Sequence, residues 1–503
     1  MAQNYIELHT RSAFSFLEGA SVPEDLIAGG LAFDMPAMAL LDRDGVYGAP
    51  RFHLAAKKNG IKAHIGAELK VSGLKSKDIF ILPLLAQSRT GYQNLCRLIT
   101  LMKLRVPKHA KPGECVVTPE EIAMYAQGLI CMTGSEEGPL AIRDTATRGR
   151  PDTEKAKETA EWLVDVFGQG NVYAELQRHF DREEEIRNQA MVDIARRLKL
   201  PLLATNGVCH ATVAQRQVAD VFTCIRNHVR LETAGRLLAK NSERFLKAPQ
   251  TMCRLFADLP EAIANTVELS SRLEFTLEDL GYEFPKYPVP DGETMASFLR
   301  KRTEEGARRC YTGRNSTPTY EKAHAQIDRE LALIEKLKLE GYFLIVWDIV
   351  QFCRGHNILI QGRGSAANSA VCYSLGITAV DPVGMELLFE RFLSEGRGEW
   401  PDIDLDLPSG DHREQAIQYV YQRYGQLGAA MTANVITYRG RSAAREVGKV
   451  LGFDDDTVGR LSGLVHTWEW KDPKDSTERQ FRDAGLDLRE PRIKNFFQLY
   501  QAV

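Results

Sequence analysis

Short apolar runs alternate with amphipathic stretches along residues 1–270. Their length and apolar content predict buried strands at 36–42, 79–86, 128–133, 172–176 and 201–205. The stretch at 182–200 carries apolar residues between charged ones and is typical of the helices expected between these strands. Alternating strands and helices predict an α/β domain with a layered or barrel-like arrangement.

A polar stretch with three prolines, residues 280–294, interrupts this pattern and predicts a linker with a domain boundary near residue 280. Beyond it the pattern predicts a charged helix at 320–339, an apolar segment at 341–356, a strand at 358–360, a glycine turn with a second helix, an acidic strand at 401–407, a basic segment at 435–450 and a closing helix at 492–503. These shifts indicate three domains, at 1–280, 281–430 and 431–503.

Composition narrows the classes of protein that fit. A chain of 503 residues with 44% hydrophobic and 26% charged residues suits a globular protein of more than one domain. The net charge is only -3, so contact with nucleic acid would require a local basic face. Nine scattered cysteines without a CxxC pair argue against a disulfide framework or a zinc ribbon. Without a long apolar run, we expect a cytoplasmic protein with no membrane partner.

Three aspartates alternate with apolar residues in the acidic strand. Asp402, Asp404 and Asp406 would share one face, because strand side chains alternate with a period of two. Carboxylates about 7 Å apart repel each other unless a cation lies between them. Two Mg²⁺ ions are the usual solution in phosphoryl transfer, although an exposed edge strand would also keep such side chains in water.

A glycine turn precedes the acidic strand by about forty residues. Gly362, Arg363, Gly364 and Ser365 lie between the expected strand and a helix of small residues. Glycines admit a phosphate close to the backbone, a helix N-terminus offers N–H groups, and arginine adds a bidentate contact. The alternative is a tight turn in which Ser365 only caps the helix. Together with the aspartates, the turn indicates a triphosphate cradle beside a metal site.

The runs at 341–350, 361–382 and 387–425 are similar to the palm domain of the bacterial DNA polymerase III alpha subunits, the C-family DNA polymerases. The sequences QGRGSAANS and PDIDLDLPSG resemble the error-prone, damage-response branch of this family more than the replicative branch. This likeness extends over essentially the whole chain. It implies an α/β multidomain protein: a PHP-type (polymerase and histidinol phosphatase) β/α barrel, a polymerase-beta-like nucleotidyltransferase palm and a partial helical thumb.

The resemblance also implies roles for the palm residues. It makes Gly364 and Ser365 the pair that grips the incoming nucleotide, and Asp404 and Asp406 the catalytic metal ligands, with Asp402 in support. Arg363 and Arg391 are the corresponding candidates for phosphate contacts. The family needs a third aspartate after a histidine-glycine motif, and neither appears before Val503. We therefore expect a fragment or a truncated product that does not polymerise DNA alone.

Residues 1–270 resemble the PHP domain of the same family, which holds a metal cluster in some members. His9, Asp42 and Glu68 stand at ligand-type positions. Other expected ligands are replaced, by Arg11, Arg43, Gly207 and Cys209. Arginine cannot ligate a metal and repels one, so we expect a structural domain without hydrolase activity. His210 is either a substitute ligand or, more simply, a loop histidine with its own partner.

A basic helix is expected at 442–451, with Ser442 as N-cap and Gly452 just beyond its C-terminus. Arg441, Arg445 and Lys449 recur every four residues and form one stripe. The stripe could be an ordinary solvated face, but the resemblance places it in the thumb, where duplex phosphates are the partner.

Three functions stay open at this point. The first is an error-prone DNA polymerase in damage-induced mutagenesis and translesion synthesis, using Mg²⁺, deoxynucleoside triphosphates and primer-template DNA, with a sliding clamp and accessory mutagenesis proteins bound through C-terminal regions beyond this chain. The second is a PHP-type metal-dependent phosphoesterase. The third is a non-catalytic DNA-binding remnant, which would bind primer-template DNA without incorporating nucleotides.

Overall fold

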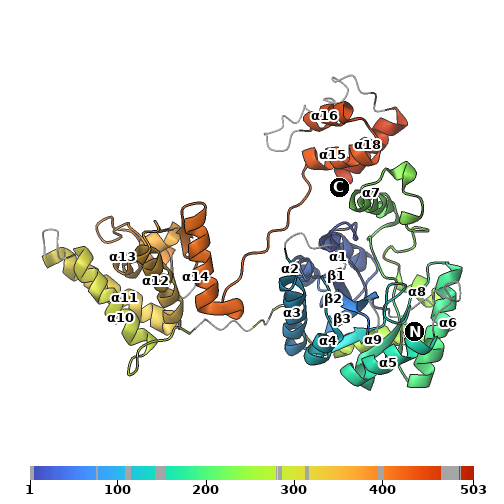
Figure 1. The fold of residues 1–503 in the computed structure, drawn as a ribbon, viewed down its shortest axis with the longest axis horizontal. Coiled ribbons are helices and arrows are strands. Elements are labelled where there is room, and N and C mark those ends of the chain that lie inside the picture. The colour runs from blue at the N-terminus through green and yellow to red at the C-terminus, as the bar shows by residue number, and fades with distance from the viewer. Residues whose placement is uncertain are drawn as a thin grey trace. The chain divides into compact units, whose positions relative to one another are not determined.

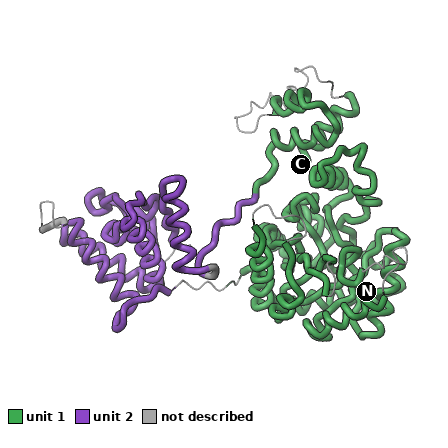
Figure 2. Tube along the Cα trace, in the orientation of Figure 1, with its two compact units in different colours: residues 1–280, 436–503 green, residues 281–435 purple. Residues whose placement is uncertain are grey.

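The computed structural model describes residues 5–74, 78–107, 115–141, 153–278, 280, 286–311, 317–394, 401–465, 487 and 489–503. The chain divides into two compact units, residues 1–280 with 436–503 and residues 281–435 (Figure 2). It therefore leaves the first unit, forms the second and then returns to the first. Within the described residues, no helix has the length and apolar character to cross a membrane.

A six-stranded sheet forms the centre of the first unit (Figure 1). Its strands pair in sequence order, β1 (Ala37–Arg43), β2 (Lys62–Ser72), β3 (Ile79–Ala86), β4 (Leu129–Met132), β5 (Val172–Leu176) and β6 (Leu202–Ala204). The β2–β3 and β3–β4 pairs are antiparallel and the others are parallel. The five strands predicted from apolar runs are confirmed. The strand β2 was not predicted, because its apolar residues alternate with polar ones and form no continuous apolar run.

The N-terminal segment joins the two ends of this sheet. On one side the Leu41 N–H donates to the Thr10 carbonyl at 2.8 Å. On the other side the Arg11 N–H donates to the Val208 carbonyl at 2.8 Å, and Val208 donates back to His9 at 2.9 Å. The segment thus lies between β1 and the residues that follow β6, and the sheet curls into the barrel-like form predicted from the sequence.

Both faces of the sheet are buried. Leu40, Ile65 and Leu84 belong to one apolar core, whereas Leu41, Leu85 and neighbouring strand residues pack into a second core against one of the helices. A strand covered on both faces has a continuous apolar sequence, which explains the runs. The surrounding helices are α1 (Pro23–Ala32), α2 (Ala49–Lys58), α3 (Arg89–Leu104), α4 (Pro119–Tyr125), α5 (Thr153–Phe167), α6 (Arg182–Leu198), α7 (Arg216–Asn227), α8 (Pro249–Leu255) and α9 (Pro260–Arg272).

Three C-terminal helices complete the first unit: α15 (Gly440–Val450), α16 (Asp455–Gly463) and α18 (Pro491–Ala502). The helices α15 and α18 pack against α7, and α16 packs against α15. Val221 and Cys224 of α7 share one apolar core with Val447 of α15 and Phe496 of α18. The predicted N-cap at Ser442 is wrong. The helix begins two residues earlier, and the Ser442 hydroxyl accepts a hydrogen bond from the Arg439 N–H at 2.9 Å. Gly452 lies beyond the helix end with φ +73°, as predicted.

The second unit consists of helices around one short antiparallel pair of strands. Its elements are α10 (Met295–Tyr311), α11 (Thr317–Lys336), α12 (Glu340–Gly355), β7 (Gln361–Arg363), the 3-10 turn η6 (Gly364–Asn368), α13 (Ala370–Leu375), the 3-10 turn η7 (Phe389–Arg391), β8 (Asp404–Asp406) and α14 (Asp411–Gly428). The strand predicted at 358–360 is wrong by three residues, since pairing begins at Gln361.

A buried carboxylate fixes the start of α13. Glu330 of α11 is fully buried and accepts hydrogen bonds from the Ser369 hydroxyl at 2.7 Å and from the N–H groups of Ala370 at 2.9 Å and Val371 at 3.0 Å. Ser369, and not Ser365, caps the helix. The helix N-terminus proposed as a phosphate cradle is therefore occupied by the protein's own carboxylate, and the turn η6 stands in front of it.

Removing this carboxylate should weaken the second unit. Each buried donor left without an acceptor costs about 1–3 kcal/mol, so Glu330→Ala is expected to lower the free energy of unfolding by about 3 kcal/mol or more. Glu335→Ala changes an exposed glutamate of the same helix and serves as the control. Urea unfolding of both variants tests this. Equal midpoints would contradict the role of Glu330.

Candidate functional site

Arg363, Asp404 and Asp406 meet on one face of the β7–β8 pair. The strands are antiparallel, with Arg363 opposite Asp404 and Gln361 opposite Asp406. Arg363 donates a hydrogen bond from Nε to Asp406 Oδ1 at 3.1 Å and forms an ion pair with Asp404, whose Oδ2 lies 3.1 Å from Nη1. The turn arginine and the two aspartates that were predicted to work together therefore lie in direct contact.

The remaining predicted palm residues lie around this pair. Gly364 has φ +73°, and a Cβ there would lie 3.9 Å from Asp404 Oδ2, so the turn begins beside the carboxylate. Ser365 lies in η6, where its carbonyl accepts from the Asn368 side chain at 2.9 Å. Arg391 ends η7, which contacts η6. Asp402 is exposed and lies before β8, so the strand that joins the aspartates holds two of them and not three.

The carboxylates of β8 suit a hard divalent cation. Asp404 and Asp406 supply oxygen atoms on one face. Together with Asp402 they carry more negative charge than the single positive charge of Arg363 neutralises. Among the described residues no three Asp, Glu, His or Cys side chains converge closely enough to hold a metal ion, so β8 offers a pair of ligands. The pair fits a cation whose other ligands come from a substrate phosphate or from water.

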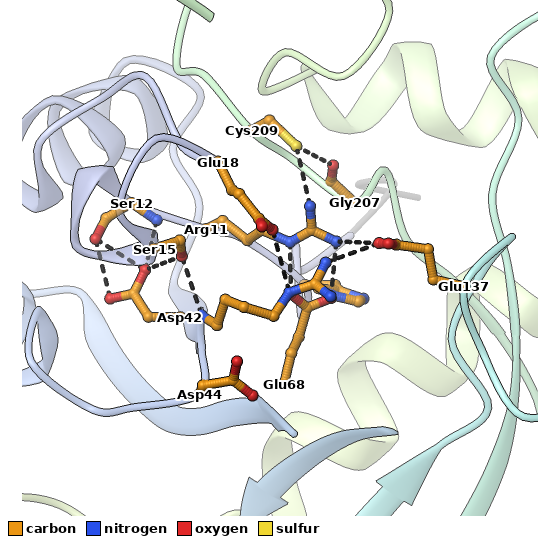
Figure 3. A network of polar contacts seen from close by, with 12 residues as sticks. Arg11, Ser12, Ser15, Glu18, Asp42, Asp44, Glu68, Glu137, Gly207 and Cys209 are labelled. Carbon is orange, nitrogen blue, oxygen red and sulfur yellow. Dashed lines mark hydrogen bonds and ion pairs between the residues drawn. The ribbon is translucent and has the colours of Figure 1, made fainter. Parts of the chain in front are cut away.

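Glu68 is the centre of a buried polar network in the first unit (Figure 3). It is 1% exposed and contacts three basic groups: His9 Nε2 at 2.8 Å, Arg11 Nη2 at 2.9 Å and Arg43 Nε at 3.2 Å. Burial alone would raise the pKa of Glu68, but Arg11, Arg43 and His9 outweigh it and hold the pKa well below its usual range. The carboxylate is therefore ionised and tightly paired.

His9 connects this carboxylate to a second one. Its Nδ1 lies 2.6 Å from Glu175 Oε1 at the end of β5. Burial lowers the pKa of His9, but Glu175 and Glu68 outweigh that effect and raise the pKa to about 10. Asp42, the third predicted ligand, accepts hydrogen bonds instead from the Ser12 hydroxyl at 2.9 Å and the Ser15 hydroxyl at 2.8 Å.

These residues do not fit the metal cluster expected of a PHP domain. The oxygens of Glu68 are engaged by two guanidinium groups and a protonated imidazole, which repel a cation and leave it no ligand there. Arg43 also pairs with Glu137 at 2.7 Å. The arginines at the expected ligand positions thus turn a metal-ligating carboxylate into one partner of an ion-pair network.

Gly207, Cys209 and His210, near the other expected ligand positions, each have local contacts of their own. Gly207 has φ +52°, a backbone conformation that larger residues rarely adopt, and a Cβ there would also displace the Gln177 amide, which lies 2.6 Å from its position. Arg11 Nη1 lies 3.8 Å from the Cys209 sulfur. His210 Nδ1 bonds the Thr212 carbonyl at 2.8 Å, which agrees with a loop histidine. A cleft of about 550 Å³ opens onto Arg11, Cys209 and His210.

Four acidic partners of this network were not identified from the sequence: Glu7, Glu18, Glu137 and Glu175. Glu7 is buried, and burial raises its pKa to about 7 despite donors from Tyr5, His9 and Asn206. Glu175 is the next-to-last residue of a predicted strand, and an acidic residue inside a buried apolar run was the available signal. Glu137 lies in a loop, where the sequence offered no signal.

The basic stripe on α15 is exposed. Arg441, Arg445 and Lys449 face solvent, while Ala444 and Val447 face α7. Lys449 also pairs with Glu446 at 2.8 Å. The stripe belongs to the first unit, whereas the β7–β8 site belongs to the second.

Two protein-family models match the chain, one in each half. Residues 7–179 match the PHP domain family, and residues 297–503 match the bacterial DNA polymerase III alpha NTPase domain family. The chain thus combines a PHP domain with a domain of the bacterial DNA polymerase III alpha family.

Curated relatives that match nearly the whole chain are named error-prone DNA polymerases. An error-prone DNA polymerase from Dechloromonas aromatica is 39% identical over 99% of this chain and 46% of its own length. Another from Mycolicibacterium paratuberculosis is 41% identical over 94% of this chain and 43% of its own length. The chain spans less than half the length of these relatives. Among solved structures, an amidohydrolase from Chromobacterium violaceum matches 41% of the chain and 88% of its own at 13% identity, but its TM-score of 0.27 supports no argument.

The Glu68 network makes a prediction for stability. Glu68→Gln leaves buried cations without their carboxylate, and we expect the free energy of unfolding at pH 7 to fall by about 3–5 kcal/mol. Glu137→Gln, a rim partner whose side chain is 55% exposed, should cost less than about 1 kcal/mol. Denaturant unfolding of both variants measures the difference.

The difference in unfolding free energy between wild type and Glu68→Gln should depend on pH in a defined direction. Because the folded pKa of Glu68 is depressed, its contribution is present above the unfolded pKa and is lost as the pH falls through the folded value. The gap between wild type and Glu68→Gln should therefore close only under acid conditions. A gap that opens as the pH falls would contradict this assignment.

Proposed function

We propose that this chain supplies the PHP and palm parts of an error-prone DNA polymerase that transfers nucleotides to a primer end. The observation that carries the proposal is the contact of the turn residue Arg363 with Asp404 and Asp406 across the β7–β8 pair. It joins a basic, glycine-containing turn to two carboxylates on one face, within the region that matches the polymerase III alpha family.

In this proposal Asp404 and Asp406 hold Mg²⁺. When bound, the metal would activate the attacking oxygen and neutralise charge on the phosphates. The chain's own residues position the nucleotide: Gly364 brings the backbone close to the phosphates, Ser365 and Arg363 donate to them, and Arg391 adds a further positive charge. Glu330 already fills the N-terminus of α13, which leaves the turn η6 as the phosphate-binding element.

The DNA contact is assigned to the stripe on α15, where Arg441, Arg445 and Lys449 would meet phosphates of primer-template DNA. The same proposal includes binding to a sliding clamp and to accessory mutagenesis proteins. It also includes a location in the cytoplasm, where bacterial DNA is found. The phosphoesterase alternative is disfavoured, because Arg11 and Arg43 occupy the oxygens of Glu68 that a metal would need.

Metal-dependent nucleotide binding tests the palm assignment. The wild-type chain should bind a fluorescent deoxynucleoside triphosphate more tightly with Mn²⁺ than without it. Asp404→Asn or Asp406→Asn removes a ligand, and each should weaken Mn²⁺-dependent binding by about tenfold or more. Asp411→Asn changes an exposed aspartate at the start of α14 and should have no effect. Unchanged binding in both β8 variants would exclude them as the metal site.

Salt dependence tests the DNA assignment. Fluorescence anisotropy with primer-template DNA should show a logarithmic salt slope that is smaller by about 2 in the double variant Arg441→Ala/Arg445→Ala, because two phosphate contacts are lost. Arg196→Ala/Arg197→Ala removes two exposed arginines of α6 and is the matched control. If both pairs change the slope equally, α15 is not the DNA-binding element. DNA binding without nucleotide binding would instead favour the non-catalytic remnant.

A further inference from the structure

Arg363 uses the same oxygens that a catalytic cation would need. Its Nη1 contacts Oδ2 of Asp404 and its Nε contacts Oδ1 of Asp406, both at 3.1 Å. The guanidinium thereby bridges two carboxylates that would otherwise repel each other. A cation bound to these oxygens and a guanidinium in this position repel one another, since both are positive.

We propose that Arg363 and the divalent cation compete for Asp404 and Asp406, so that metal binding releases Arg363 to the phosphates of the nucleotide. This inference rests on the proposed polymerase function and adds to it an order of events within the site. The arginine is then a positioning residue with two alternative partners: the aspartates before the metal binds, and the triphosphate afterwards.

The exchange has to occur by movement and not by loss of a proton. Hydrogen bonding to Asp406, with the charges of Asp404, Asp406 and Asp402, raises the pKa of Arg363 above its already high value. The guanidinium therefore stays charged. A positive group displaced from the aspartates needs another anion nearby, and the triphosphate bound at the adjacent turn is that anion.

The exposure of the three side chains makes this movement easy. The side chains of Arg363, Asp404 and Asp406 are 58%, 42% and 61% exposed, so water screens the ion pairs and each adds little stability. The backbone beneath them is fixed, because the Gly362 N–H donates to the Ile377 carbonyl at 2.7 Å and a Cβ at Gly362 would lie 2.6 Å from that oxygen. The Arg363 side chain can thus change partners while β7 stays in register.

This competition couples the two ligands. If the metal releases Arg363 to the triphosphate, the metal strengthens nucleotide binding, and by linkage the nucleotide strengthens metal binding to the same extent. Arg363 is required for that part of the coupling. Its removal should therefore act in opposite directions on the metal alone and on the nucleotide with metal, which a merely structural residue would not do.

The test measures both quantities on the full chain. Free Mn²⁺ is followed by electron paramagnetic resonance without nucleotide, and a fluorescent deoxynucleoside triphosphate is titrated at saturating Mn²⁺. For Arg363→Gln we expect Mn²⁺ alone to bind about three- to tenfold more tightly and the nucleotide to bind more weakly. Arg363→Lys, which keeps the charge without the fork, should lie between Arg363→Gln and wild type in both measurements. Arg413→Gln, an exposed arginine of α14, controls for the change in net charge.

The outcomes separate this inference from the proposed function. If wild type binds nucleotide only with Mn²⁺ but Arg363→Gln leaves Mn²⁺ affinity unchanged or lowers it, the competition is overturned and the polymerase assignment stands. The competition is also overturned if Arg413→Gln tightens Mn²⁺ binding as much as Arg363→Gln. If wild type binds neither Mn²⁺ nor the nucleotide, the proposed function fails, and this inference fails with it.

Discussion

The register between β7 and β8 is the constraint on which the candidate palm site depends. Each strand has three residues, and a slip by one residue would turn Asp404 and Asp406 to the opposite face. Two contacts outside the pair oppose a slip. Gly362 is tied to Ile377, and the Ile403 N–H donates to the Tyr342 hydroxyl of α12 at 3.0 Å. Ile403 is itself 9% exposed, so the apolar face of the strand is anchored in the core of the second unit.

Buried carboxylates organise both units, and each is satisfied by different chemistry. Glu68 pairs with guanidinium and imidazole groups, whereas Glu330 accepts backbone N–H groups at a helix end. Asp348 of α12, which is only partly buried, accepts hydrogen bonds from the hydroxyls of Tyr419 at 2.6 Å, Tyr424 at 2.8 Å and Tyr287 at 3.0 Å. In every case the carboxylate joins elements distant in sequence, because a buried anion is stable only where several donors converge.

Much of this architecture was accessible from the sequence, for identifiable reasons. Strands buried on both faces can be recognised in the sequence as apolar runs. The glycine turn and the paired aspartates can be recognised because each lies within a short segment of the sequence. β2 was missed because its apolar residues alternate with polar ones, although Glu68 within it was identified. The helix after the turn was placed too early, because small residues allow both a 3-10 turn and a helix. Only tertiary contact with Glu330 decides between them.

Partners such as Glu330 could not be assigned from local pattern. A glutamate on a charged helix is ordinarily exposed, and nothing near Glu330 indicates that Ser369, about forty residues later, needs an acceptor. Likewise, Arg11 and Arg43 were recognised as substitutions at ligand positions, but their convergence on one oxygen pair is a property of the folded barrel. Residue types are visible in a sequence, whereas the pairing of buried charges depends on topology.

The packing of α15 and α18 onto α7 has a consequence for how the chain folds as it is made. Val221 and Cys224 emerge from the ribosome more than two hundred residues before Val447 and Phe496, the side chains that cover them. During that interval the apolar face of α7 is exposed to water, while the intervening unit, whose contacts are internal, can already form. Such delayed burial leaves an apolar surface open to aggregation until the C-terminal helices have been made.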